Sequence, residues 1–295
     1  MERINEPDIA VLNLKPGLFF PGLIIFLLVS FNSPGQETES VNNVLILKDK
    51  GLKIENTISL YTSRAKYQAM ITGQGSKMFL DARFVIINGD TLNVQAIKTR
   101  GHSTLNLRRK SLGFNLKSNA SFYHGEKKES LKRFYALSLC MDKDYVNNRM
   151  AFEMMERIGI FSLFYTFCEM RINNHSEGIY MVIERPEDWA IKKKESPIII
   201  RRGYNQSIDK IASDDKTGKD EIRRYCDNFR LIYKYLGRYD GEKLYQMISP
   251  LIDLDNYMKW LGFNFLVRNG DYTDEVYFYF DNIINKFGII PWDYD

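Results

Sequence analysis

Residues 83–117 read "RFVIINGDTLNVQAIKTRGHSTLNLRRKSLGFNLK". Two apolar-rich runs flank Asn88-Gly89-Asp90, and an Asn-Gly pair between such runs is a strong signal for a β-hairpin. A second alternating run, Lys110–Lys117, follows a turn that carries Gly101. Residues 44–117 are therefore predicted to form an antiparallel, strand-rich N-terminal lobe.

Beyond this lobe the apolar residues recur with helical spacing. The segment "YVNNRMAFEMMERIG" (145–159) predicts a helix that ends at its glycine. Its apolar stripe is expected to comprise Met150, Phe152, Met154, Met155 and Ile158.

The rest of the chain mixes helices with hairpins. A hairpin is predicted around Asn173–Glu177, and helices are predicted over Asp220–Leu236 and Leu251–Val267. Residues 205–220 are charged and contain glycine and serine, which favours a mobile loop. Two strands separated by a turn at Ile284–Lys286 are expected at the end. The predicted fold class is α+β.

Composition and charge limit the classes of function. The 295 residues are 44% hydrophobic and 14% aromatic, which is typical of a globular protein, and the net charge of +4 is too small to predict a nucleic-acid partner. Charge is uneven: Thr91–Gly125 contains cations and no acid, whereas Asp271–Asp295 contains acids and a single Lys286. One region is suited to anions and the other to cations, although two solvated faces would look the same. Cys140, Cys168 and Cys226 lack metal-ligand spacing.

The N-terminus is predicted to be a targeting segment. The apolar run Leu18–Phe31 is short for a membrane span of ~20 residues and is followed by small residues. Residues 1–35 are interpreted as a signal peptide or N-terminal anchor, with cleavage before Gln36, and residues 36–43 as a linker. A buried core helix is the alternative. Export to the periplasm, cell surface or exterior follows, with membrane contact only if the segment stays attached.

Three pieces of the sequence carry chemistry. The glycine turn "TRGHST" with neighbouring cations can bind phosphates. Asp271 follows a predicted helix and is of the kind that accepts a proton from a hydroxyl nucleophile. Asp293 and Asp295, two apart in an extended segment, point the same way and suit Mg²⁺. Each piece alone also fits an ordinary turn or solvated acids.

Together these pieces occur in the order that a phosphoryl-transfer enzyme needs. A glycoside hydrolase, which needs two facing acids, would use the same carboxylates but leaves the cationic glycine turn without a role. A non-catalytic cell-envelope or surface-assembly protein on the same fold is a third hypothesis.

Over roughly residues 80–295 the chain resembles the CotH kinase family. "IKTRGHSTLNLRRKSLGFNLK" is similar to the family's R-G-N-S-(S/T) followed by Lys-Ser and a strand. "INNHSEGIYMVIE" resembles its central hairpin, and "NGDYTDEVYFYFDN…GIIPWDYD" resembles its D-x-x-x-N…P-W-D-x-D. The resemblance implies an atypical protein-kinase-like fold with a strand-rich lobe and a mixed helical and β-hairpin lobe. It also implies transfer of phosphate from ATP to protein Ser/Thr with Mg²⁺ or Mn²⁺.

Carried over to this sequence, the resemblance assigns roles to particular residues. Asp271 would be the catalytic aspartate, and Lys110 the phosphate lysine, with Lys117 as the second candidate. Asp293 would bind metal, with Asp295 as the second candidate. The residues expected around the nucleotide are Arg100, Gly101, Ser103, Thr104 and Glu184.

The sequence departs from the family pattern at three points. His102 replaces the usual Asn, Asn147 or Asn148 stands where Arg is expected, and the Asn that follows the catalytic Asp falls near Glu275 or Val276. Glu275 would then be a metal ligand. Relatives continue beyond P-W-D-x-D, so the chain is expected to lack C-terminal helices and to expose Ile289, Ile290 and Trp292. On this expectation the chain would be inactive or nearly so, and prone to aggregate.

Overall fold

The computed structural model describes residues 54–73, 75–101, 103–142, 145–160, 162–270, 272, 276–292 and 294, with the side chain of Ser103 excepted. Ile54–Asp295 forms one compact unit. The predicted targeting segment (1–35), the linker (36–43) and a strand beginning at Val44 lie outside the described residues. Within the described residues, no helix is both long and apolar enough to span a membrane.

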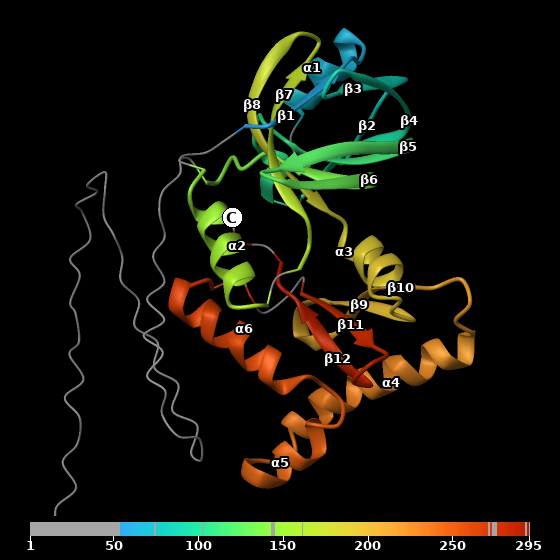
Figure 1. Ribbon diagram of the computed structural model, residues 1–295, viewed down its shortest axis with the longest axis vertical. Coiled ribbons are helices and arrows are strands. Elements are labelled where there is room, and N and C mark those ends of the chain that lie inside the picture. Colours follow the sequence, from blue (N-terminus) through green and yellow to red (C-terminus); the bar gives the residue numbers. More distant parts are fainter. Residues whose placement is uncertain are drawn as a thin grey trace, which may run out of the picture. The chain divides into compact units, whose positions relative to one another are not determined.

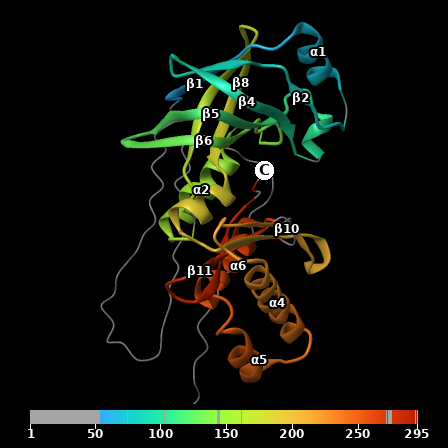
Figure 2. The same cartoon turned by 90° about the vertical axis from the view of Figure 1, so that its right-hand side faces the viewer.

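The N-terminal part is an eight-stranded sheet in the order β2-β4-β3-β1-β7-β8-β6-β5. Its strands are β1 (Asn56–Leu60), β2 (Phe79–Leu80), β3 (Phe84–Ile87), β4 (Asp90–Arg100), β5 (Ser111–His124), β6 (Lys127–Leu137), β7 (Tyr165–Ile172) and β8 (His175–Glu184). Because β4 also pairs with β5, the sheet closes on itself and is barrel-like (Figures 1 and 2). Only β1 and β7 pair in parallel within this sheet of the described chain. Helix α1 (Arg64–Thr72) follows β1.

Both predicted hairpins of this sheet are confirmed. Between β3 and β4, Asn88 has φ 52° and Gly89 has φ 91°; between β7 and β8, Asn173 has φ 50° and Asn174 has φ 66°. Two consecutive residues with positive φ are what a tight hairpin turn requires, and Asn and Gly tolerate that backbone best. The strand that starts after Lys110 continues to His124, well beyond the predicted limit at Lys117.

The interior of the barrel-like sheet is apolar. Phe114 and Phe134 stack with their ring centroids 4.7 Å apart, and Phe122 meets Phe134 edge-on at 4.9 Å. Other buried members of this core are Ile58, Leu60, Val85, Ile97, Leu112, Leu116 and Val182.

A second, four-stranded sheet has the order β10-β9-β11-β12. Its strands are β9 (Ile198–Arg202), β10 (Ile208–Ser213), β11 (Tyr277–Asp281) and β12 (Lys286–Ile290), and helices α4 (Lys219–Leu236), α5 (Gly241–Ile248) and α6 (Leu254–Val267) accompany it (Figure 1). The predicted loop at 205–220 is therefore wrong over β10, because that segment pairs with the apolar strand β9. The terminal hairpin and two of the helices are confirmed.

Helical segments occur at two further places in the chain, and the second of them connects the eight-stranded sheet to the four-stranded sheet. Helix α2 (Asn147–Arg157) lies between β6 and β7, and α3 (Pro186–Asp188) with the π-helical turn η2 (Trp189–Lys193) follows β8. Phe152 and Met155 of α2 are buried as predicted, but Met150 is 37% exposed and Ile158 is 41% exposed. The apolar stripe of α2 is thus narrower than its sequence suggests.

The predicted exposure of the C-terminal strand is wrong. Ile289, Ile290 and Trp292 are 3%, 3% and 5% exposed. Trp292 packs edge-on against Tyr135 of β6 and Tyr277 of β11, at centroid distances of 5.9 and 5.7 Å. Elements already present in this chain therefore cover the segment. The fold class is α+β, as predicted.

Candidate functional site

The glycine turn lies at the end of β4. Gly101 has φ +106°, and a Cβ atom there would lie 2.0 Å from the Thr104 Oγ1 atom. Any other residue would be strained by the positive φ, and its Cβ atom would clash with Thr104. The turn therefore requires glycine. The 3₁₀ helix η1 (Ser103–Asn106) follows directly. Gly101 and Thr104 are both partly exposed, as a ligand-binding turn requires.

Arg100, the last residue of β4, joins this turn to the C-terminal motif. Its guanidinium carbon lies 4.0 Å from the centroid of the Tyr135 ring and 5.5 Å from that of Trp292. Such stacking fixes a guanidinium in place and leaves its edge N–H groups for other partners. The R-G segment and the P-W segment, at opposite ends of the matching sequence, therefore meet at one place.

Further cations lie around the same place. The guanidinium of Arg185, just after β8, lies 5.3 Å from the Tyr135 centroid. Burial raises the pKa of Tyr277, and Glu187 raises it further, while Arg201 and Arg100 act in the opposite direction. We call the set Arg100, Tyr135, Arg185, Arg201, Tyr277 and Trp292 the junction cluster.

Two buried polar atoms in and beside the junction cluster make no hydrogen bond among the described residues. Arg185 Nε and Oε2 of Glu187, an acid beside the cluster, form an ion pair at 3.6 Å, and neither of these buried atoms makes a hydrogen bond among the described residues. Buried polar groups are nearly always satisfied, so such exceptions are typical of groups that meet a ligand or water. Burial also lowers the pKa of the nearby Lys210, and Arg201 lowers it further.

Lys110, in contrast, makes its hydrogen bonds within the loop that precedes it. It is 2% exposed, and its Nζ atom donates to the carbonyl oxygens of Leu105 at 2.9 Å and Leu107 at 2.8 Å. Lys117 is exposed in the middle of β5, six residues and about 20 Å along the strand from Ser111, which pairs with Arg100. The structure therefore brings Arg100 and Gly101, but not Lys117, to the junction cluster.

Glu184 ends β8 beside the connection to the second sheet. It is 2% exposed, and both it and Glu129 pair with Lys193 of η2, at 2.9 and 2.8 Å. Burial raises the pKa of Glu184, and the Lys193 ammonium opposes that shift. Through this ion pair, Glu184 of the barrel-like sheet holds η2, part of the segment that connects the two sheets.

Asp271, Glu275, Asp293 and Asp295 lie outside the described residues, so their roles stay predictions. Neighbouring residues in the sequence are described. Buried Arg202 donates to the Tyr272 carbonyl oxygen at 2.8 Å, and its backbone N–H donates to that of Val276 at 2.8 Å. Tyr272 and Val276, the described residues nearest to 273–275 on either side, are thus both hydrogen-bonded to Arg202 of β9. No group of three or more metal-ligating side chains occurs among the described residues.

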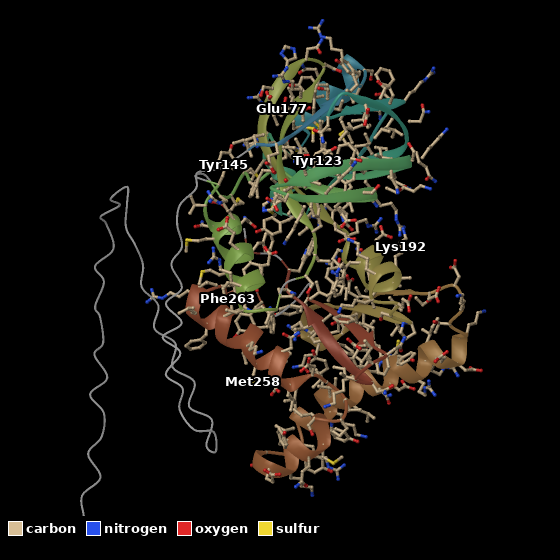
Figure 3. All side chains as sticks on the ribbon, viewed as in Figure 1. Tyr123, Tyr145, Glu177, Lys192, Met258 and Phe263 are labelled. Atoms are coloured by element: carbon tan, nitrogen blue, oxygen red, sulfur yellow. The ribbon has the colours of Figure 1, made fainter. Side chains whose placement is uncertain are left out.

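A second ionic contact holds the connecting segment. Asp188 of α3 is 7% exposed, accepts from Arg133 Nε of β6 at 2.9 Å, and pairs with Lys192 at 3.2 Å. Lys192 is labelled on this segment in Figure 3. Burial alone would raise the pKa of Asp188, but the two cations more than offset it, so the pKa is lowered.

The Asp188→Asn variant should therefore lose stability in a pH-dependent way. A carboxylate with a lowered pKa stabilises the fold above its unfolded-state pKa of about 3.9, and this contribution is lost as the pH falls through the folded-state pKa. We expect Asn to lower the unfolding free energy by about 1–3 kcal/mol at pH 7, with the deficit shrinking below about pH 4. Urea unfolding at both pH values measures this.

Asp227→Asn is the matched control, since the Arg230–Asp227 pair is 62% and 60% exposed and such pairs contribute little. Equal losses in both variants at pH 7 would contradict the role assigned to Asp188.

Sequence reasoning missed several members of the junction cluster. Tyr135, Arg185, Arg201 and Tyr277 were not predicted, because they come from four separate strand ends. The only available signal was the occurrence of arginine at the ends of apolar strands, as in "VIERP" and "IIIRR".

The observed class of protein is thus an α+β protein with a barrel-like sheet and a cationic, aromatic cluster where that sheet meets a second one. The family described as "CotH kinase protein" matches residues 97–295. The chain belongs to this family.

A curated relative is similar as well. The protein named "Inner spore coat protein H", from Bacillus subtilis (strain 168), is 20% identical over 193 residues, covering 59% of this chain and 52% of that protein. The chain therefore spans about half the length of that relative.

Proposed function

We propose that this protein is an exported, CotH-like kinase that transfers phosphate from ATP to Ser or Thr of a protein, with Mg²⁺ or Mn²⁺. The observation that carries the proposal is the contact between Arg100 and Trp292, in which the guanidinium carbon lies 5.5 Å from the ring centroid. Arg100 begins the glycine turn that resembles the family's phosphate-binding segment, and Trp292 precedes Asp293, the proposed metal ligand. On this proposal the barrel-like sheet and the second sheet are the two lobes of a kinase-like fold.

The junction cluster fits a polyphosphate. Among the described residues of this neighbourhood, the cations Arg100, Arg185, Arg201 and Lys210 outnumber the acids Glu187, Asp188 and Asp209. Arg201 pairs with Asp209 at 3.2 Å. Guanidinium groups are well suited to phosphate oxygens because their planar donors match two oxygens at once. Tyr135 and Trp292 add flat surfaces on which these guanidinium groups stay oriented.

The remaining roles come from the family resemblance. Asp271 would accept the proton of the attacking hydroxyl, while Asp293, with Asp295 and Glu275 as further candidates, would hold the metal ion. A bound Mg²⁺ supplies neutralisation of the charge that develops on the phosphates. The apolar run Leu18–Phe31 supports export.

A second candidate function is a non-catalytic role in surface assembly. It is favoured by the name of the relative, which is that of a spore coat protein. The two candidates differ in one property, since only a kinase needs nucleotide and metal together.

Calorimetric titration of the full chain with MgATP tests the proposal. We expect binding that requires the metal, and an Arg100→Gln variant that binds about 10–100-fold more weakly, because a charge-assisted hydrogen bond contributes about 1.5–3 kcal/mol. Asp293→Asn should instead raise the Mg²⁺ concentration needed for half-maximal binding.

Lys132→Met, on the exposed side of β6, serves as the control and should bind as the parent does. No heat of binding from the parent chain, with or without metal, would refute the kinase proposal and leave the assembly role.

A further inference from the structure

Lys110 is a buried lysine on the inner face of the barrel-like sheet. It immediately precedes β5, and the alternating residues Leu112, Phe114 and Leu116 are buried in the same core. Since side chains on a strand alternate between faces, Lys110 continues this inward row. A lysine in such a row is unusual, because lysine is rarely fully buried without a partner.

The partner of Lys110 is the loop that precedes it. The ammonium group has three N–H donors, and two of them bind the carbonyl oxygens of Leu105 and Leu107. These carbonyls lie at the C-terminal end of η1, where a cation also interacts favourably with unpaired backbone oxygens. Burial lowers the pKa of Lys110, while its proximity to Cys140 acts in the opposite direction.

We infer that Lys110 is a positioning residue that holds residues 103–109 of the preceding loop in their folded form, and that Arg100, not Lys110, meets the nucleotide phosphates. The second half of this inference rests on the proposed function, whereas the first half does not. A phosphate could meet only the one remaining N–H of Lys110, and this lysine is 2% exposed.

Arg109 secures the same loop from another side. Its Nη1 atom donates to the Tyr145 hydroxyl at 2.9 Å, and its Nη2 atom donates to the Ile179 carbonyl oxygen. Its guanidinium carbon lies 5.1 Å from the Tyr180 ring centroid. Tyr145 is labelled near the start of α2 in Figure 3.

The backbone of β8 accommodates this contact. Gly178 has φ +83°, and a Cβ atom there would lie 3.5 Å from the Arg109 guanidinium. The loop that carries Gly101 is therefore fixed to the sheet through Lys110 on the inside and through Arg109 on β8. This double attachment is what a preorganised phosphate-binding turn needs.

Hydrogen exchange of the full chain without nucleotide tests the first half of the inference. Lys110→Met keeps an unbranched side chain that is one atom shorter and removes its donors. In this variant, amide exchange in residues 103–109 should rise by about tenfold or more, because two hydrogen bonds are lost. Exchange in Lys132→Met should match the parent. Unchanged exchange of the loop in a folded Lys110→Met would overturn the positioning role.

Titration with MgADP tests the second half. We expect Lys110→Met to bind about tenfold more weakly, in step with its looser loop. Weaker binding with an unchanged loop would identify Lys110 as a direct phosphate ligand and overturn the inference.

A measurement on the parent chain covers the case in which Lys110→Met does not fold. Among the lysine ammonium ¹H–¹⁵N signals of the parent, that of Lys110 should exchange slowly with water, unlike those of exposed lysines. The chemical shift of this signal should change little when MgADP is added. A large shift on binding would overturn the inference. If the parent binds no MgADP, the proposed function fails, while the exchange data still decide the role of Lys110 in the loop.

Discussion

The Asp271→Asn variant of this protein is expected to lose about 10²–10⁴-fold of its phosphoryl-transfer rate, the usual range when a general base is removed. Asparagine keeps the shape of the side chain but cannot accept the proton of the attacking hydroxyl. Binding of MgATP should be nearly unchanged, because Asp271 is proposed to act on the acceptor and not on the nucleotide. Transfer rates and calorimetric affinities, measured on the same preparation, test both statements.

Asp281→Asn is a suitable control, since Asp281 caps the turn after β11 by accepting from the Ile283 backbone N–H at 2.8 Å. It should keep the transfer rate of the parent. Comparable rates in Asp271→Asn and the parent would show that the proton acceptor lies elsewhere.

The Trp292→Ala variant is expected to lose about 3–5 kcal/mol of unfolding free energy, the range for truncating a buried large aromatic residue. Trp292 is 5% exposed and contacts Tyr135, Tyr277 and Arg100. The loss should also weaken MgATP binding, because the Arg100 guanidinium would lose one of the two rings that orient it. Chemical denaturation and calorimetry measure the two effects.

Trp292→Phe should retain much of the packing and is the matched variant. The exposed aromatic Phe265, 83% exposed on α6, gives the opposite control, since Phe265→Ala should change stability by no more than about 0.5 kcal/mol. A Trp292→Ala variant as stable as the parent would contradict the burial of the C-terminal segment.

Local features of this fold could be predicted from the sequence because their causes are local. The turns at Asn88-Gly89 and Asn173-Asn174 require residues that tolerate positive φ, and both were evident. The long helix α4 follows from the helical spacing of its apolar residues, of which Tyr225, Phe229 and Ile232 are buried.

The pairing of strands that are distant in the sequence could not be predicted in the same way. The pairing of β4 with β5 closes the sheet, and the parallel pairing of β1 with β7 joins segments about a hundred residues apart; neither has a signature in adjacent residues. For the same reason β10 looked like a loop, since its partner β9, and not its own charged sequence, stabilises it.

The candidate site likewise contains residues that a local motif identifies and residues that only long-range packing brings together. Arg100 and Gly101 were identified from a short motif, and the structure brings Arg100 to Trp292. The residues that complete the junction cluster, such as Arg185 and Tyr277, became apparent only from the packing of strand ends. Lys110 was chosen for its residue type, but its environment is decided by the inward face on which it falls.

Phosphoryl transfer by the full chain is the most direct test of the central proposal. The chain is incubated with ATP labelled at the γ-phosphate, Mg²⁺, and dephosphorylated casein as a Ser- and Thr-containing acceptor. We predict label on Ser or Thr of the acceptor or of the protein itself, dependent on the metal and nearly abolished in Asp271→Asn. Absence of label from both proteins, under conditions where calorimetry detects bound MgATP, would contradict the kinase proposal.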